Sequence, residues 1–384
     1  MNTKKKVPII RIKGFNDDWE RRKLGELVNV CSGRDYKHLS EGTIPVYGTG
    51  GYMLSVNEAL SYDEDAIGIG RKGTIDKPYI LRAPFWTVDT LFYAIPREEV
   101  DLNFAFDIFQ NIDWKKKDES TGVPSLSKTA INDIDVLAPI YDEQQVIGQF
   151  FSRIDNLITL HQREIDRIVC LRKAMVEKMF PQNGADVPAV RFSRYKEPWR
   201  LCQFSEIFTE RHIIDTISDE YPQLAFTIEE GVIRPEDKKT NKRDFLIIDK
   251  ATKKYLQTEY DDIIYNPANV IYGAIHRNAL GKGCVSPIYK IFYTDQDSTF
   301  MECIVRHPNF IKEISRSMEG TVKKLRTLKP KAFLEMSAYI APTIEEQRQI
   351  GEYFRQMDRL IEIEKEELEK IKHIKSACLE KMFV

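Results

Sequence analysis

Apolar residues recur at alternating steps of four and three residues along two separate stretches of the chain, 142–182 and 343–384. The first series runs through Ile147, Phe151, Ile154, Ile158, Ile165, Ile168, Met175 and Met179, and the second through Ile350, Phe354, Met357, Ile361, Leu368, Ile371, Cys378 and Met382. This spacing is a heptad seam, which predicts two long helices with a packing partner. We assign the first four residues of each series to the interface between the helices or with a partner protein.

Each predicted seam is interrupted twice, by His161 and Arg172 in the first stretch and by Glu364 and Lys375 in the second. A helix of about 38 residues, rising about 1.5 Å per residue, is a rod of about 55–60 Å. Such a rod cannot bury its apolar stripe alone, and the other stretch is the available partner. We therefore expect an antiparallel coiled coil with the two remaining parts of the chain at opposite ends, related by a pseudo-twofold axis.

The two stretches belong to a repeat that covers most of the chain. "APIYDEQQVIGQFFSRID" begins at Ala138, and "APTIEEQRQIGEYFRQMD" begins 203 residues later at Ala341, with 8 of 18 positions identical. Upstream, "VPIIRIKGFNDDWERRKLGEL" from Val7 resembles "VPAVRFSRYKEPWRLCQFSEI" from Val187, at an offset of 180 residues. The chain thus contains two copies of one repeat, and each copy consists of a start motif, a variable body and a shared helix.

The two bodies, residues 15–137 and 195–340, are predicted to be of mixed α+β structure. Short β-rich runs such as "AIGIG" and "NVIYGAI" alternate in them with glycine and proline. The predicted domain boundaries are 1–141 and 183–342 for the body domains, with the helices at 142–182 and 343–384. Beyond the start motif and the helix the two bodies look unalike, which indicates two tasks of one kind with different targets.

Composition places the chain among globular proteins of the cytoplasm. It is 42% apolar and 30% charged, and no apolar run approaches the length of a membrane span. The six cysteines are scattered without a C-x-x-C pair, which indicates reduced thiols rather than a disulfide framework. The net charge of −2 argues mildly against a nucleic-acid binder, although local patches can still be basic.

Motifs for bond chemistry are absent from the sequence. Gly68–Gly73 fits G-x-G-x-x-G, but the following "TIDKPYILRAP" has no helical period, as a dinucleotide site would require. Asn266–Asn269, "NPAN", lacks the second proline and the aromatic residue of an amino-methyltransferase loop. The histidines show no metal-ligand spacing, and no P-loop is present. We therefore predict that the chain catalyses no reaction and holds no metal.

Clusters of glycine, hydroxyl and basic residues in the bodies have the chemistry to bind phosphates and bases. In the first body they are Tyr47, Gly48, Thr49, Gly50, Arg71, Lys72, Thr74, Trp86, Thr87, Ser125, Ser127 and Lys128. In the second body they are His276, Arg277, Asn278, Lys282, Lys323, Lys324 and Arg326. Both sets fall in the dissimilar bodies rather than the shared helices, which favours a role for these clusters in binding.

The order of these features resembles the specificity subunit of type I restriction–modification systems over nearly the whole chain. In that family a start motif with arginine and tryptophan precedes a target-recognition domain, a helix that begins A-P-x-x-x-E-Q-x-x-I follows it, and the unit is repeated. Here the start motifs are Arg11–Trp19 and Arg191–Trp199, and the helix starts are Ala138–Ile147 and Ala341–Ile350. One departure is Ser205, which stands where the first copy has glycine.

The resemblance implies that each body domain reads one half of a bipartite double-stranded DNA site. It also implies that the helix pair sets the spacer between the halves and docks two methyltransferase (modification) subunits. Restriction subunits, which hold the ATP-driven translocase, join that core. S-adenosylmethionine, ATP and Mg²⁺ would then be bound by the partners and none by this chain.

Two alternatives remain open at this point. A non-catalytic, two-lobed scaffold that does not bind DNA directly would share the predicted helices but would not need the basic loops. A stand-alone methyltransferase would need a cofactor loop and a base-flipping motif, and the sequence offers neither in convincing form.

Overall fold

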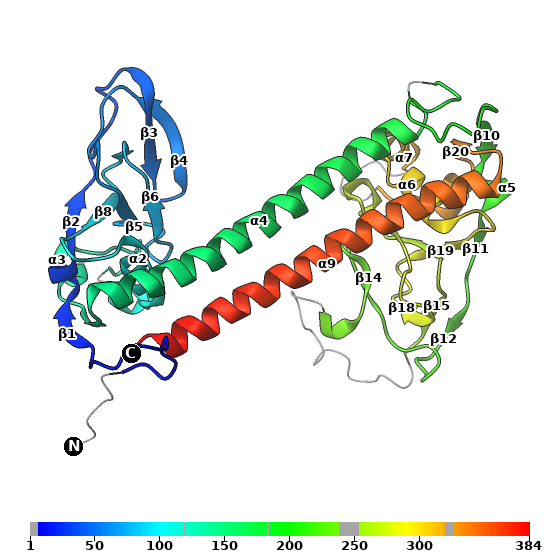
Figure 1. The fold of residues 1–384 in the computed structure, drawn as a ribbon. Helices are drawn as coiled ribbons and strands as arrows, with labels where there is room; N and C mark the ends of the chain where they lie inside the picture. The colour runs from blue at the N-terminus through cyan, green and yellow to red at the C-terminus, as the bar shows by residue number, and fades with distance from the viewer. Residues whose placement is uncertain (1–6, 119, 183, 238–252, 319–325) are drawn as a thin grey trace. The chain divides into compact units, whose positions relative to one another are not determined.

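The computed structural model describes residues 7–118, 120–182, 184–237, 253–318 and 326–384 of the chain (Figure 1). The chain divides into two units, one made of Met1–Glu164 with Glu364–Val384 and the other of Ile165–Ile363. Each unit combines β-strands with short helices, so the predicted mixed α/β character is confirmed. The domain boundaries at 141, 182 and 342 stay a prediction.

The first unit contains two small sheets and a two-stranded ribbon. Its strands are β1 Glu20–Lys23, β2 Val28–Ser32, β3 Glu41–Gly48, β4 Gly51–Val56, β5 Ala66–Gly70, β6 Tyr79–Leu81, β7 Trp86–Thr87, β8 Leu91–Pro96 and β9 Asp135–Ala138. One sheet has the antiparallel order β2-β8-β5-β6, and the other has the order β4-β3-β7, in which β3 and β7 run parallel. The ribbon pairs β1 with β9, so the start motif is joined to the segment just before the first long helix.

Short helices cover the first sheet and bury its central strand. They are α1 Leu24–Leu27, α2 Leu102–Asn111, the 3-10 helix η1 Trp114–Lys117 and α3 Lys128–Asn132. Helix α2 packs on β5 and β8, and it buries Phe104, Ile108 and Phe109. All five residues of β5 are buried. This burial explains why "AIGIG" is apolar throughout rather than alternating in polarity.

The second unit has shorter strands and a different sheet arrangement. Its strands are β10 Arg200–Gln203, β11 Thr209–Glu210, β12 Ile214–Asp215, β13 Ala225–Thr227, β14 Gly231–Ile233, β15 Tyr255–Thr258, β16 Ile263–Tyr265, β17 Ile275–Arg277, β18 Gly283–Val285, β19 Lys290–Tyr293 and β20 Ser337–Ile340. They form the groups β11-β19-β16-β17, β12-β15-β18, β13-β14 and β10-β20. Its short helices are α5 Phe204–Ile207, α6 Ser298–Val305, α7 Pro308–Ser317, α8 Pro330–Leu334 and the 3-10 helices η2 Pro235–Asp237 and η4 Val270–Tyr272.

Two helices of 39 residues each, α4 Tyr141–Met179 and α9 Ile344–Met382, occupy the two heptad stretches. They confirm the helices predicted from the apolar seam. Acidic residues in their first turns and a lysine in their last turns complement the helix dipole. The first part of α4 and the last part of α9 belong to the first unit, and the remaining parts belong to the second.

Polar residues that interrupt the seams form an ion pair and a hydrogen-bond contact between the two helices within the first unit. Lys375 of α9 pairs with Asp155 of α4. Further along α4, His161 Nδ1 lies 2.7 Å from Oε2 of Glu364. The later residue of α4 thus meets the earlier residue of α9, which means that the two helix segments run antiparallel in this unit.

The second unit contains the counterpart of the Lys375–Asp155 pair. Arg172 Nη2 of α4 donates to Oδ2 of Asp358 in α9 at 3.0 Å. The repeat offset of 203 residues relates 172 to 375 and 155 to 358. The same helix-to-helix charge pairing is therefore built into each unit, from the residues that break the heptad pattern.

The predicted interface residues lie in the cores of the two units. They are Ile147, Phe151, Ile154 and Ile158 in the first core and Ile350, Phe354 and Met357 in the second, and Ile361 is also buried. Phe383, just after α9, lies 5.9 Å from Phe151 between ring centres, and Phe180, just after α4, lies 6.1 Å from Phe354. The start of each seam therefore packs against a body and also contacts the aromatic residue that follows the other long helix. A contact with a partner subunit at these residues stays a prediction.

A buried ion pair in each unit joins the start motif to the first turn of a long helix. Arg11 donates from Nε and Nη2 to the two carboxylate oxygens of Glu143, at 2.8 and 2.7 Å. Arg191 makes the same double contact with Glu346, at 2.6 and 2.9 Å. Neither glutamate side chain has any exposed surface. Two parallel charge-assisted hydrogen bonds hold the start motif against the helix in a fixed orientation.

A second repeated contact links the same helix turn to the body. The backbone N–H of Asp101, which caps α2, donates to Gln144 Oε1 at 3.2 Å, and that of Asp297, which caps α6, donates to Gln347 Oε1 at 3.2 Å. Gly148 and Gly351, each four residues after the glutamine, are required because the cap residue lies so close to the helix. A β-carbon at Gly148 would lie 2.3 Å from the Asp101 carboxylate.

Replacing Arg11 by alanine is expected to lower the free energy of unfolding by about 3–5 kcal/mol, because the fully buried Glu143 would lose its charge partner. Urea unfolding monitored by circular dichroism measures this loss. The matched control is Arg21→Ala, which breaks the exposed pair with Asp135 and should cost less than about 1 kcal/mol. Equal losses in the two variants would show that the buried pair has no special role.

Candidate nucleic-acid interface

One turn after β7 holds two of the predicted DNA-contact loops together in the first unit. The backbone N–H of Val88 donates to the Tyr47 carbonyl, close to the tip of the β3–β4 hairpin, at 3.0 Å. The backbone N–H groups of Arg71 and Lys72 donate to the Thr90 carbonyl at 2.8 and 3.3 Å. The glycine-rich hairpin and the basic 71–74 loop, although 24 residues apart in sequence from Tyr47 to Arg71, therefore meet at residues 88–90.

The hydroxyl-rich segment before α3 lies beside the same basic loop. Lys72 and Ser125 form an isolated antiparallel bridge. Ser127 caps α3, because its hydroxyl accepts from the Ala130 N–H at 3.0 Å, and Lys128 is the first residue of that helix. Three predicted clusters of the first body are thus brought together, and Arg71, Lys72 and the adjoining Thr74 are exposed within them.

The hairpin between β3 and β4 presents its tip to solvent. Gly50 is exposed at the tip, and Thr49 beside it is half-buried. The Tyr79 hydroxyl donates to the Gly48 carbonyl at 2.6 Å and thereby fixes the hairpin to β6, and burial raises the pKa of this phenol. Tyr52, on the other arm of the hairpin, has 62% of its surface exposed. The hairpin is therefore held rigidly while its tip stays free for contact.

Trp86 and Thr87 occupy a different position from the loops around them, because both are buried. Trp86 Nε1 donates to the Arg34 carbonyl at 2.9 Å, and the Arg34 N–H donates to the Thr87 carbonyl at 2.8 Å. In the described structure these two residues support the 33–38 loop from inside. A direct contact of either with DNA stays a prediction.

Arg34 and Lys37 are candidate contact residues that the sequence analysis missed. Both are exposed, and no acidic side chain of the described residues pairs with either. The signal that could have found them is the glycine that precedes the arginine. A β-carbon at Gly33 would lie 2.0 Å from the Val88 carbonyl oxygen, so this loop must pass close to the turn that anchors the other loops.

Most predicted contact residues of the second unit whose positions are described are engaged in internal contacts. Arg277 Nη1 donates to Asp261 Oδ1 at 2.9 Å, and its Nε lies 3.7 Å from Oε2 of Glu302. His276 is buried, and its Nδ1 lies 2.9 Å from Nη1 of Arg306. Together they form a charged network between β17 and α6, which engages the side chains that the sequence analysis assigned to DNA bases, although the buried Nε of Arg277 has no hydrogen-bond partner there.

Asn278 and Lys282 also have partners within the second unit. The Asn278 amide has no exposed surface, and it donates to the Gly281 carbonyl at 2.7 Å while accepting from the Leu280 N–H at 3.0 Å. It therefore closes its own loop. Lys282 is exposed and pairs with the exposed Glu220. Arg326 is exposed, whereas Lys323 and Lys324 lie outside the described residues. Contact of this set with DNA stays a prediction.

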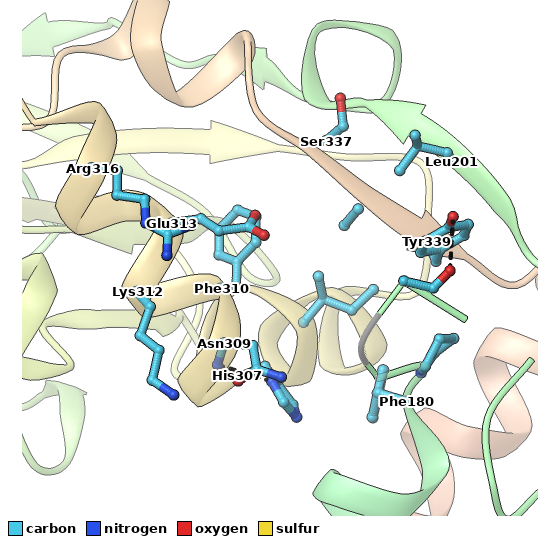
Figure 2. Close-up of a pocket in the computed structure, with 14 residues that line it drawn as sticks. Phe180, Leu201, His307, Asn309, Phe310, Lys312, Glu313, Arg316, Ser337 and Tyr339 are labelled. Carbon is cyan, nitrogen blue, oxygen red and sulfur yellow. Dashed lines mark hydrogen bonds between the residues drawn. The ribbon is translucent and has the colours of Figure 1, made fainter. Parts of the chain in front are cut away.

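A pocket of about 390 Å³ opens between α7, β20 and the segment that follows α4. Figure 2 shows Phe310, Lys312 and Arg316 of α7 on one side of it and Leu201, Tyr339 and Phe180 on the other. None of the residues predicted to contact DNA lines it. The pocket therefore gives no support to a nucleic-acid contact by the second unit.

Neither a metal site nor a membrane span is found in the part of the chain that the structure describes. There, no three histidine, cysteine or acidic side chains are grouped so that they could hold a metal ion. No described helix combines the length and the apolar character that crossing a membrane requires.

Comparison with known proteins identifies the body that carries these loops. Residues 16–169 match the family described as the type I restriction modification DNA specificity domain. Among curated proteins, the type I restriction enzyme MjaVIII specificity subunit of Methanocaldococcus jannaschii is 21% identical, over 94% of this chain and 91% of its own length.

The fold also has a solved counterpart. The crystal structure of a type I restriction–modification system S subunit from M. genitalium superposes with a TM-score of 0.68 at 15% identity, and covers 98% of this chain and 99% of that one. The resemblance inferred from the repeated motifs, to type I restriction–modification specificity subunits, is confirmed. The loop cluster at residues 88–90 lies within the matched DNA specificity domain.

The network around Glu302 predicts a pH dependence of stability in the second unit. Burial alone would raise the pKa of Glu302, but the neighbouring His276 and the charge of Arg306 lower it to about 2. A carboxyl with a lowered folded-state pKa stabilises the fold above its unfolded pKa, and this stabilisation is lost as the pH falls through the folded value. The contribution is about 3 kcal/mol and should disappear between about pH 5 and pH 2.

Urea unfolding of Glu302→Gln at pH 7 and at steps down to pH 3 measures this contribution. The destabilisation relative to the unaltered protein should be largest at pH 7 and should shrink steadily on acidification. Glu313→Gln, which removes an exposed carboxylate on α7, is the matched control and should show little effect at any pH. If the destabilisation caused by Glu302→Gln did not vary with pH, the ionisation of Glu302 would be excluded as its cause.

Proposed function

We propose that this chain is the DNA sequence-specificity subunit of a type I restriction–modification complex, and that each unit reads one half of a bipartite double-stranded DNA site. The match of residues 16–169 to the DNA specificity domain family carries the proposal for the first unit. The internal repeat, which gives both units the same start motif and the same helix contacts, extends it to the second. Two similar readers suit two half-sites on antiparallel DNA strands.

The loop cluster of the first unit supports a DNA contact through its charge and its exposure. Arg34, Lys37, Arg71 and Lys72 are exposed around one turn, and none of them pairs with an acidic side chain among the described residues. Cations without an acidic partner bind phosphates and set the position of a reader on the duplex. The adjoining hairpin tip with Thr49 supplies a backbone that can approach a base or a phosphate closely.

The helix pair acts, in this proposal, as the spacer between the two readers. The ion pairs at the seam breaks support an antiparallel coiled coil, because their order is reversed along α4 and α9. His161 and Glu364 are equivalent positions of the repeat, 203 residues apart, and they contact each other. A residue that meets its own repeat equivalent lies on a pseudo-twofold axis, so this contact supports the predicted symmetry.

The same helices dock the modification subunits. A second apolar stripe on α4, outside the buried seam, remains at least 38% exposed at each of its members: Val146, Phe150, Leu157 and Leu160. Exposed apolar residues at helical spacing on a surface mark a contact with another protein. Restriction subunits complete the complex. The chain itself is non-catalytic, and S-adenosylmethionine, ATP and Mg²⁺ are bound by the partners.

Lengthening the helix pair tests the spacer role. Seven residues with the heptad pattern are inserted into α4 after Ile158 and into α9 after the repeat-equivalent Ile361, so that both seams keep their register. Seven residues add about 10 Å of helix, and the spacer of the recognised site should grow by about three base pairs. Base-resolution mapping of methylated adenines in cells that carry the three-component system measures the spacer.

The two half-site sequences serve as the internal control of that experiment, because they should remain those of the unaltered subunit. An unchanged spacer would contradict the proposed spacer role while leaving DNA reading intact. Loss of all methylation in a variant that still assembles with its partners would also count against it. If the unaltered complex methylated no specific site, the chain would be the non-DNA scaffold considered above.

Removing charge from the basic loop tests the DNA contact itself. The double variant Arg71→Ala/Lys72→Ala should bind its site more weakly and reduce the slope of log affinity against log salt by about 1 for each phosphate that is no longer neutralised. Binding is measured by fluorescence anisotropy with the assembled modification complex at several salt concentrations. Arg82→Ala is the matched control, since its guanidinium is already paired with Asp65. A salt slope unchanged in the double variant would place this loop outside the interface.

A further inference from the structure

A polar cavity of about 310 Å³ lies in the first unit between α2, α4 and β6. Eight of its eleven lining residues are polar, and the pocket is partly open to solvent beside helices that also contribute to the core. The side chains used in the argument below are Asp107 and Gln110 from α2 and Asp155 from α4. This cavity is remote in sequence from the basic loops assigned to DNA and has no place in the function proposed so far.

Two oxygen atoms of the cavity residues lack a hydrogen-bond partner in the described structure. They are Oδ2 of Asp107 and Oε1 of Gln110, and both atoms are fully buried. Asp107 as a whole is 1% exposed. Buried acceptors are nearly always paired in folded proteins, because leaving one without a donor costs the full desolvation of the group. The two unpaired oxygens therefore point to a donor supplied from outside the chain.

The second unit shows that its fold does not need an acid at this position. Asp107 stands six residues after the cap of α2, Asp101, and Cys303 stands six residues after the cap of α6, Asp297. Cys303 is buried, and burial raises the pKa of its thiol to about 12, which keeps it uncharged. The same frame accepts a neutral thiol where the first unit buries a carboxyl group. The packing of this helix therefore does not by itself require a buried carboxyl group at Asp107.

The charged groups around Asp107 and its cavity come from three helices and from the segment after β6, where Arg82 lines the cavity and is paired with Asp65. Lys375 of α9 attracts a carboxylate there, but it is already paired with Asp155 of α4, and Asp155 and Asp101 both oppose a further negative charge. Burial and these acidic neighbours raise the pKa of Asp107 well above its ordinary value. A cation that entered the cavity would reverse this balance and draw a proton off the carboxyl group.

We propose that this cavity binds a guanidinium group, which donates to Asp107 and to Gln110. A guanidinium offers five N–H donors in a planar fork and can serve several acceptors at once, whereas an ammonium offers three donors from one point. The unpaired carboxylate oxygen, the unpaired amide oxygen and Asp155 provide acceptors from two helices. The group belongs either to an arginine side chain of a partner subunit or to a free guanidinium compound.

Binding of arginine amide to the full-length chain tests the proposal, with citrulline amide as the uncharged isostere. Isothermal titration calorimetry and ligand-observed NMR should show saturable binding of arginine amide at least about tenfold tighter than that of citrulline amide, because only the cation can pair with Asp107. Lysine amide should bind less tightly than arginine amide. Equal binding of the arginine and citrulline compounds would overturn the proposal.

Two substitutions of Asp107 locate the binding in this cavity. Asp107→Asn keeps the shape, and Asp107→Cys copies the residue of the second unit, so at least one of them should fold normally. Each should abolish the tenfold preference for arginine amide. Asp63→Asn, which removes an exposed carboxylate of the same unit, is the matched control and should leave the preference intact. Retention of the preference in both Asp107 variants would exclude this cavity.

Proton release distinguishes the proposed contact from general attraction to an acidic surface. Calorimetry in two buffers of different ionisation enthalpy should show that arginine amide displaces protons from the unaltered chain but not from Asp107→Asn. A further arm, which relies on the proposed function, repeats the titration with the complex assembled from its modification subunits. Loss of arginine-amide binding there assigns the guanidinium to a partner arginine, and persistent binding assigns it to a free compound.

Discussion

Arg11 with Glu143 in the first unit, and Arg191 with Glu346 in the second, join parts of the chain that are far apart in sequence. The arginine belongs to the start motif, and the glutamate lies in the first turn of a long helix. With the glutamate fully buried, the pair is stable only in one geometry, since any other would leave a charge in the core without its partner. The ribbon of β1 with β9, or of β10 with β20, closes the same junction. Each body is thereby anchored at both of its ends to the first turn of a long helix. The residues of the body between these two ends can therefore differ.

The two interiors have in fact changed while the frame has not. The first unit pairs β3 with β7 in parallel, whereas the second has a separate β13-β14 pair and shorter strands. The Arg–Glu pair, the Gln144–Asp101 contact and the aromatic residue after each helix recur in both. A fold that anchors its body at one end of a helix leaves the distant loops free of structural demands. Such loops can acquire different base contacts without loss of stability, which is what two independent readers need.

Much of the frame could be predicted from the sequence, because local periodicity and repetition specify it. The four-three spacing predicted both long helices, and the seam breaks at His161, Arg172, Glu364 and Lys375 proved to be positions of polar contact between the helices. The candidate site was less predictable. Composition identifies a side chain that can bind a base or a phosphate. It does not reveal whether another residue of the protein, distant in sequence, already forms an ion pair with that side chain. Arg277 meets Asp261 and Glu302, which lie 16 and 25 residues away in the chain. Arg34 was missed for the opposite reason, since its proximity to the other loops arises from backbone contacts with Thr87.

A spacer between two readers must resist sliding as well as bending, and the helix contacts are suited to this. Helix α4 contributes Phe151 to the core of the first unit and Met179 to that of the second, so both of its ends are anchored. A slip of α9 along α4 by one residue would turn each side chain by about 100° and move it by about 1.5 Å. Such a slip would break Lys375–Asp155 in the first unit and Arg172–Asp358 in the second, and it would withdraw Phe383 from its aromatic neighbours. The charges that interrupt the seam therefore reduce its hydrophobic contact area. In exchange they fix the alignment of α4 with α9, as single polar positions do in coiled coils. In the proposed spacer role, a defined register matters more than the last increment of stability.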